Sequence, residues 1–466
     1  MTAKLKKAAA AVLAAAITIG FGSVGAGAAN NSKANAKADE LSSAMSKLND
    51  VKLKNKTVKW LAHYDLNPNP TQIGSIKSTD VELFERKYGG KIEWYPTTWD
   101  NRYSDLATHI LGGTGIDIFT CYNTYNLPKG VISGMLQPVD DYINLNDSIW
   151  KNTKKAMETY NFGGDHFMFV TDVEAEALVY YNTATIKKYG LDDPWELYEK
   201  GEWNWNTFKS MLKKFVDEDK ERYGLDGWWS ETALLYSAGV PVVKQTKGHL
   251  VSNLKSKTVK KAMDYQYGLY KDGLVLDKEM FRWSDQPQMM SDGRQLFLIG
   301  GSWMINDYPD GWYHSIPPKN LGVVPVPSPK GSKPYQAAQL DGYVLCKGAE
   351  NPEGAARFAE CGIIAAYDKD ARKLERQKKM TYCGWSSKIA NRIDKINALA
   401  RKYPVVDLAD GCSTDIASFT TQGGDMVGIR AALHGTEWKY TREEIADAIE
   451  MLVDEVDDNL QKKISS

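Results

Sequence analysis

TDVELFERKYGGKIEWYP, residues 79–96, contains a predicted helix that runs directly into a predicted strand. Phe84 and Tyr88 lie on one face at helical spacing, and two glycines end this pattern. Thr79 and Glu82 have the spacing of a capping box at the start of a helix. KIEWYP then alternates between apolar and polar residues, as a half-buried strand does. The stretch therefore predicts one helix-to-strand unit of an α/β fold.

The same alternation extends to both sides of this unit. TVKWLAHYDL (57–66) predicts a strand that runs into a loop, RYSDLATHILGG (102–113) a helix, and IDIFTCYN (116–123) a short buried strand. This βαβαβ order predicts a largely parallel sheet wrapped by helices. Such sheets bind ligands at the carboxyl ends of their strands. The residues at two of these ends are candidate ligand contacts: Tyr64, Asp65, Tyr122 and Asn123.

Length and composition narrow the class of protein. A chain of 466 residues is long enough for two or three lobes. It is 43% hydrophobic and 25% charged, which is typical of a globular protein. The formal net charge of -1 gives no reason to expect a nucleic-acid partner or an anionic membrane surface. With 14 Trp and 25 Tyr, the chain has rings to spare for a binding surface.

The first 28 residues predict a cleavable secretory signal. Three lysines precede the apolar run AAAAVLAAAITI, and small residues follow as far as Ala28. The apolar run is shorter than the ~20 residues that a membrane span needs. Residues 29–51 are polar and predict a linker. We therefore expect an exported protein, either periplasmic or extracellular at the cell surface.

A family resemblance rests on several stretches that occur in the family's order and together cover most of residues 56–460. They are FERKYGGKIEW, YSDLATHILGGTGIDIF, GMLQPVDDYI, ALVYYNTATIKKYGL, WNWNTFKSMLKKF, QLFLIGGSWMI, LGVVPVPSPKG, DGYVLCKGAENPEGAARFAE and TREEIADAIEMLVDEV. With them the chain resembles the extracellular solute-binding proteins of ABC transporters, in carbohydrate-binding family 1, which includes maltose-binding protein.

The resemblance implies a two-lobed, type II periplasmic-binding-protein-like fold that closes around its ligand. Each lobe is expected to hold a mixed, mostly parallel sheet flanked by helices. The hinge strands would be EAEALVYYN (174–182) and LGVVPVP (321–327). The implied boundaries are residues 52–174 with 323–390 for lobe 1, and residues 175–322 with 391–466 for lobe 2.

The resemblance also implies a function. The protein would capture a sugar or oligosaccharide in the cleft between the lobes and deliver it to the membrane permease subunits of an ABC importer, acting as a monomer. One feature departs from the family. Gram-positive members normally carry a lipobox cysteine at the signal cleavage site, whereas the first cysteine here is Cys121. How the protein is held at the cell surface is therefore left open.

A sugar site needs aromatic plates and planar polar groups. Trp228 and Trp229 follow a glycine in DGWWSE, and we expect one ring to stack on the ligand and the other to be buried, because neighbouring residues point apart. The alternative is that both belong to the core. Asp172 and Glu174 before the hinge are further candidates, and the alternative for them is a solvated pair. The remaining candidates are Glu231, Trp303, Asp341 and Trp385.

Motifs for catalysis are missing from the sequence. It contains no GxSxG, HExxH or P-loop, and DEDKERYGLDG has Arg222 where a calcium loop requires glycine. The five cysteines lack metal-ligand spacing and are interpreted as buried small hydrophobes. We therefore expect no enzymatic activity, no metal and no cofactor. Two alternatives stay open: a peptide or polyamine ligand, and a secreted carbohydrate-active enzyme, for which two of the 59 acidic residues would suffice.

Overall fold

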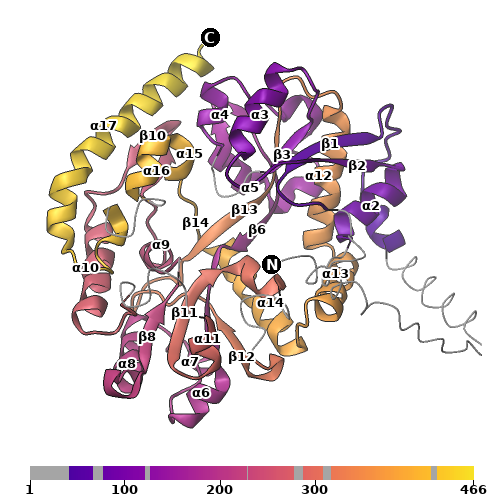
Figure 1. The fold of residues 1–466 in the computed structure, drawn as a ribbon. Helices are drawn as coiled ribbons and strands as arrows, with labels where there is room; N and C mark the ends of the chain where they lie inside the picture. Colours follow the sequence, from indigo (N-terminus) through magenta and orange to yellow (C-terminus); the bar gives the residue numbers. More distant parts are fainter. Residues whose placement is uncertain are drawn as a thin grey trace, which may run out of the picture.

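The computed structural model describes residues 41–66, 77–120, 126–227, 229–277, 287–307, 316–420 and 428–466. Two larger sheets, of six and four strands, form the centres of two lobes, with helices packed around them (Figure 1). In this part of the chain no helix has the length and apolar character to cross a membrane. The predicted two-lobed α/β architecture is confirmed.

Lobe 1 is built on the six-stranded sheet, in the order β14-β13-β3-β1-β2 with β6 also paired to β13. β1 is parallel to β2 and β3, whereas β13 is antiparallel to β3 and β6, so the sheet is mixed as predicted. The strands are β1 Thr57–Ala62, β2 Lys91–Pro96, β3 Ile118–Thr120, β6 Phe169–Ala175, β13 Gln336–Leu345 and β14 Pro404–Val405.

Lobe 2 is built on the four-stranded sheet, in the order β12-β7-β11-β8. Only β11 and β8 are parallel, while β7 is antiparallel to both β11 and β12. Parallel pairing is therefore the minority here, unlike the prediction, because β7 enters from lobe 1 whereas its neighbour β12 leads back to it. The strands are β7 Ala177–Asn182, β8 Tyr223–Asp226, β11 Gln295–Gly301 and β12 Leu321–Val324. Two short pairs are β4 Asn161–Phe162 with β5 Asp165–His166, and β9 Val243–Thr246 with β10 His249–Ser252.

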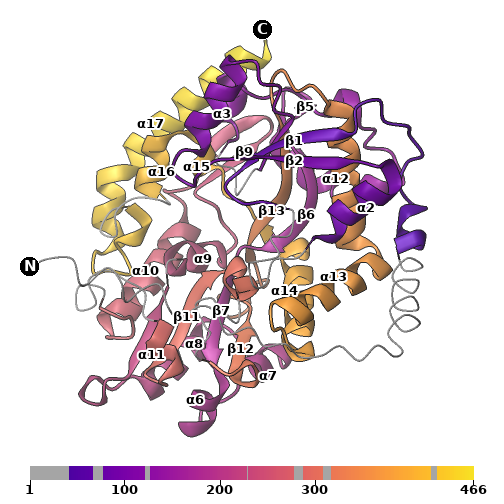
Figure 2. The same cartoon turned by 45° about the vertical axis from the view of Figure 1, so that its right-hand side comes forward.

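Helices surround both sheets (Figures 1 and 2). They are α2 Thr79–Tyr88, α3 Arg102–Leu111, α4 Lys129–Ile132, α5 Lys154–Met157, α6 Thr183–Lys188, α7 Pro194–Glu199, α8 Trp205–Phe215, α9 Ser230–Tyr236, α10 Lys257–Lys271, α11 Pro287–Ser291, α12 Pro352–Tyr367, α13 Lys369–Tyr382, α14 Ser387–Lys402, α15 Ala409–Cys412, α16 Thr414–Thr420 and α17 Trp438–Ile464.

The helix that opened the sequence analysis begins differently from the prediction. The N-cap of α2 is Ser78, and no side chain caps the helix, so the predicted capping box of Thr79 and Glu82 is wrong. The Thr79 hydroxyl instead donates to Glu375 Oε2 on α13, at 2.7 Å. A tertiary contact has therefore replaced the local one. The C-terminal end agrees with the prediction, because Gly89 adopts the left-handed conformation with φ 61°.

The chain crosses between the lobes at two neighbouring places. β6 continues into β7 with only Glu176 between them, and β12 leads back to β13 through residues 325–335. The backbone N–H of Glu176 donates to the carbonyl oxygen of Ala337 at 2.9 Å, which joins the two crossings. The crossing strands include the segments predicted as hinges.

The segment predicted as a linker packs against lobe 1 from residue 41 onward. Leu41, Ala44 and Leu48 are at most 4% exposed and belong to the lobe 1 core. Lys47 forms an ion pair with Asp368, the N-cap of α13. The end of this segment is therefore part of the folded body.

Helix α17 lies along one flank of the molecule beside α16 in both views (Figures 1 and 2). Its buried residues Ile445, Ile449 and Val453 share one hydrophobic cluster with the lobe 1 sheet. It also packs against α4, which precedes the crossing strands. The same cluster also contains Val259, Ala262 and Met263 of α10, and α17 packs against β10 and α10 as well. The placement of residues 391–466 in lobe 2 therefore stays a prediction.

Candidate functional site

The strand directions determine which ends of the two sheets face each other. In lobe 1, β6 runs toward lobe 2, and β3 runs the same way because both are antiparallel to β13. β1 and β2 are parallel to β3, so all three carboxyl ends are directed toward lobe 2. In lobe 2, β7 runs away from lobe 1, and β11 and β8 run back toward it. The loops after β1, β2, β3, β8 and β11 therefore face the opposite lobe, where ligands of such sheets bind.

Aromatic side chains gather at the lobe 1 strand ends. Tyr64 follows β1, is 37% exposed, and rests edge-on against the buried Trp60 at a centroid distance of 4.9 Å. The ring of the neighbouring His63 contacts two rings edge-on. Its centroid lies 5.1 Å from that of Tyr64 and 5.2 Å from that of Trp99, in the loop after β2. Asp65, in the same loop, is exposed. The predicted contacts Tyr64 and Asp65 are thus at the expected edge of the sheet.

Trp99 and His63 were not among the candidates that the sequence analysis named. The signal was available, since Trp99 follows β2 as Tyr64 follows β1. The guanidinium carbon of Arg102 lies 3.7 Å from the Trp99 ring centroid. Burial and the nearby Arg102 charge lower the pKa of His63 below its usual 6.5, so His63 is neutral at pH 7.

Two tryptophans meet at the lobe 2 strand ends. Trp303, after β11, is 45% exposed, and Trp229 is half-buried against the lobe 2 core. Their rings are T-shaped with centroids 6.2 Å apart. Trp229 therefore supports Trp303 from the core side. Trp228, the other half of the predicted pair, lies outside the described residues, as do Tyr122 and Asn123.

Glycines allow this tryptophan arrangement. A Cβ on Gly227, which has φ 120°, would lie 2.0 Å from the carbonyl oxygen of Ile299. A Cβ on Gly301 would lie 2.2 Å from Nε1 of Trp303. Larger residues would therefore push β8 away from β11, or push the Trp303 indole off the strand end.

Three of the acidic candidates form one cluster on β6 and β13. Asp172 on β6 and Asp341 on β13 are directly opposite each other in the register, and Glu174 is two residues along on the same face. Asp172 is 7% exposed and accepts a bidentate interaction from Arg401 of α14, at 2.6 and 2.8 Å. Asn397, one helical turn earlier, donates to Glu174 at 3.1 Å.

Burial raises the pKa of two carboxyl groups in this cluster. Burial, and then the Asp172 charge, raise the pKa of Asp341 to about 6. Burial, and then the charges of Asp341 and Asp172, raise the pKa of Glu174 well above its usual value. Gln339 donates to Asp341 at 2.5 Å. The carboxyl groups of Asp341 and Glu174 thus have partners within the protein and bind their protons more tightly than free carboxyls do.

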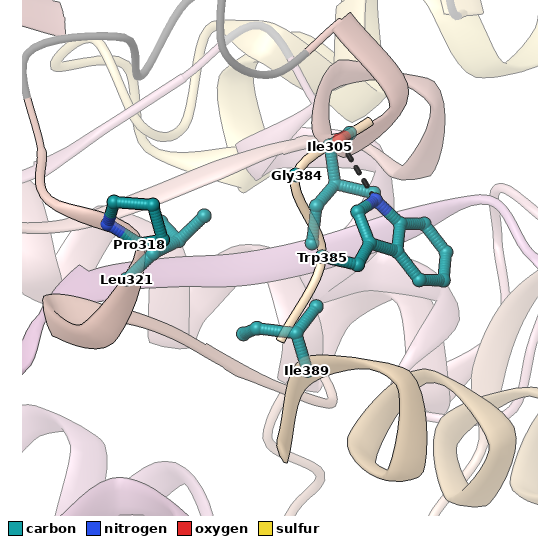
Figure 3. A pocket seen from close by; sticks show the side chains of 6 residues that line it. All are labelled: Ile305, Pro318, Leu321, Gly384, Trp385 and Ile389. Atoms are coloured by element: carbon teal, nitrogen blue, oxygen red, sulfur yellow. Dashed lines mark hydrogen bonds between the residues drawn. The ribbon is translucent and has the colours of Figure 1, made fainter. Parts of the chain in front are cut away.

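Glu231 and Trp385 also have partners within the protein. Glu231 is 5% exposed, and its Oε1 lies 2.9 Å from Nε2 of His434. Trp385 donates from Nε1 to the carbonyl oxygen of Ile305 at 3.0 Å, and so ties the α13–α14 connection to lobe 2 (Figure 3). The cavity beside Trp385 measures about 10 Å³, which is roughly the space of one water molecule.

The possible metal ligands and the cysteines of the described residues were compared with the predictions. There, no group of three or more His, Cys, Asp or Glu side chains is arranged to hold a metal ion. Cys346, Cys361, Cys383 and Cys412 are buried, in agreement with the predicted role as small hydrophobes. Cys121 lies outside the described residues.

Comparison with known proteins decides the family. The family model described as bacterial extracellular solute-binding protein matches residues 67–362, more than half of the chain. The chain belongs to this family. No curated protein sequence matches it closely enough to count as a relative.

Solved structures of solute-binding proteins share the fold. The extracellular solute-binding protein of Staphylococcus aureus, in complex with maltose, is 15% identical with a TM-score of 0.57, covering 89% of this chain and 99% of its own. The sugar-binding protein MalE of Xanthomonas citri is 14% identical with a TM-score of 0.61, covering 87% and 98%. The galacto-N-biose/lacto-N-biose I-binding protein of the ABC transporter of Bifidobacterium longum is 12% identical with a TM-score of 0.61, covering 87% and 98%. At these identities the likeness shows the fold alone, and it confirms the predicted type II architecture.

Proposed function

We propose that this solute-binding protein captures a sugar or oligosaccharide between its two lobes and delivers it to the membrane permease of an ABC importer. The observation that carries the proposal is the exposed Trp303 ring, held edge-on by Trp229 at the strand ends that face lobe 1. An indole face is a suitable surface for the C–H face of a sugar ring. The sugars bound by structurally similar proteins support the same ligand class.

The proposal includes export and function as a monomer, with the permease as the membrane partner. The protein would act as a carrier and not as an enzyme, because a carrier must release its ligand unchanged. Incubation with an oligosaccharide should therefore return the sugar at its original length. Recovery of shortened sugar would support a carbohydrate-active enzyme instead.

Ligand binding can be tested by thermal shift with a panel of mono- and oligosaccharides, peptides and polyamines. A ligand that binds only the native state raises its stability by RT ln(1 + [L]/Kd). We expect stabilisation by at least one neutral sugar and none by spermidine or short peptides. Stabilisation by peptides or polyamines alone would refute the sugar assignment.

Substitution of the two rings tests the site itself. Trp303→Ala should weaken sugar binding by roughly thirtyfold, the loss typical of an aromatic anchor of about 2 kcal/mol, at an unchanged Tm. Trp229→Ala should instead lower the Tm, because this ring packs against the lobe 2 core. Normal sugar binding by Trp303→Ala would count against the proposed site.

A further inference from the structure

The lobe 1 surface also presents an exposed tryptophan, Trp99. Among the described residues, the exposed tryptophans are Trp99, at 44%, and Trp303, at 45%. They follow strands of opposite lobes, at the strand ends that face each other. Tryptophan is a costly residue to leave in water, so two such rings at facing edges indicate a shared use.

Trp99 is held in place with one face covered. The Arg102 guanidinium, itself on a side chain only 7% exposed, lies 3.7 Å from the ring centroid. His63 meets the ring edge-on at an interplanar angle of 81°. An indole that is covered on one face, supported at its edge and still 44% exposed offers its other face to a ligand. A fixed ring also loses little entropy on binding.

The two exposed rings lie at different distances from the crossing strands. Trp303 lies close to the crossing strands. It follows Gly301, which pairs with Ala177 at the start of β7, and the backbone N–H of Ser302 donates to the carbonyl oxygen of Glu176 at 2.8 Å. Trp99 follows β2, the edge strand, separated from β13 by β3 and β1. At ~4.8 Å per strand, the end of β2 is about 14 Å from β13. A ligand that touches both rings must therefore contain several sugar units.

Charged side chains of both signs occur on the segments near the outer ring. Arg102 covers Trp99, and Lys129 lies 4.5 Å from the Tyr103 ring centroid. Asp100 is next to Trp99 in sequence, and Asp65 is in the loop after β1, both exposed. A balanced set of donors and acceptors suits the hydroxyl groups of a neutral sugar, whereas a polyamine site would need an excess of carboxylates.

We infer that Trp99 is the stacking surface of an outer sugar subsite, and that the ligand is an oligosaccharide long enough to reach from Trp303 to the outer edge of lobe 1. The inference rests on the proposed function and specifies the size class of its ligand.

The test is calorimetric titration with two series, glucose to maltotetraose and xylose to xylotetraose. Trp99→Ala should weaken the binding of the longest bound sugar by roughly tenfold and leave the shortest bound sugar within about twofold. Trp303→Ala should weaken the binding of every length. Trp99→Phe keeps a ring and should retain most of the affinity. Tyr440→Ala removes a ring that is 57% exposed on α17 and serves as the matched control, with no expected effect.

Three outcomes would overturn the inference. The first is an equal loss at every length for Trp99→Ala, and the second is no loss at any length with an unchanged Tm. The third is a parent protein whose affinity does not rise with sugar length. If no sugar of the thermal-shift panel bound the parent, the proposed function would fail along with the inference, and this outcome is recognised without any substitution.

Discussion

At the scale of the residue, the carboxyl cluster on the crossing strands makes the stability of the protein depend on pH. A carboxyl whose pKa is raised by folding binds its proton more tightly in the native state than in the unfolded state. The stability contributed by this proton is present at low pH and is lost as the pH rises through the folded-state pKa. For Asp341 that pKa is about 6, so the loss falls between about pH 4 and 7.

Asp341→Asn should remove this pH-dependent loss, because the amide keeps the shape of the side chain and does not ionise. We expect the free energy of unfolding of the variant to exceed that of the parent at pH 7.5 by on the order of 1–3 kcal/mol, and to equal it near pH 4. Urea unfolding at the two pH values measures the difference. A variant that is less stable than the parent at pH 7.5 would show that the ionised carboxylate is needed.

Substitution of Arg401 should instead lower the stability of the protein at pH 7.5. Its guanidinium donates three hydrogen bonds to the buried Asp172 carboxylate, and Arg401→Ala would leave that charge without its partner. A loss of roughly 3 kcal/mol of stability at pH 7.5 is expected. Arg372→Ala provides a control on the same flank, since its pair with Asp394 is exposed on both sides and is expected to contribute little.

At the scale of the element, helices and strands with strong apolar periodicity were predicted correctly, whereas a segment with few apolar residues was not. The helices over 79–88 and 102–111 and the strands over 57–62 and 91–96 were identified from their apolar spacing. The segment from residue 41 was read as a linker because its few apolar residues stand among polar ones. Their burial depends on partners in α2, α12 and α13 that are distant in sequence, which no local pattern contains.

The candidate site was predictable only in outline, for the same reason. Strand-end position predicted that Tyr64 lies at the carboxyl edge of the sheet, because parallel strands bring their carboxyl ends to one edge. The contacts of Tyr64 and Trp303 with a ligand stay predictions. Strand-end position could not show that Asp172 and Glu231 have partners in α14 and near residue 434. Nor could it show that Arg102 would hold Trp99 in place, since side-chain packing between loops follows from the assembled sheet.

The docked segment can be tested as an element. Leu48→Ala removes a side chain that is 4% exposed in the lobe 1 core and should cost about 2–4 kcal/mol of stability. Leu111→Ala makes the same chemical change at a residue that is 88% exposed and should leave the Tm nearly unchanged. Equal Tm values for both variants would return residues 41–51 to the role of a linker.

At the scale of the whole molecule, the two lobes are joined in a way that permits hinge motion. Glu176 and residues 325–335 carry the chain across, and α14 packs against β6 of one lobe and β12 of the other. A rotation about these crossing strands moves nearby groups little and distant groups far. Trp303 lies beside Glu176, whereas Trp99 lies at the far edge of the lobe 1 sheet.

This geometry predicts that closure depends on ligand length. A sugar that reaches Trp99 gains its outer stacking contact only when the lobes approach, so it favours the closed form by the free energy of that contact. Solution scattering should show a smaller radius of gyration with a saturating long oligosaccharide than without ligand, and a smaller change with the shortest sugar that binds. Trp99→Ala, saturated with the long sugar, should resemble the parent with the short one. An identical radius of gyration in all of these states, with binding confirmed by calorimetry, would mean that the sugar enters a preformed site and that the lobes do not close upon it.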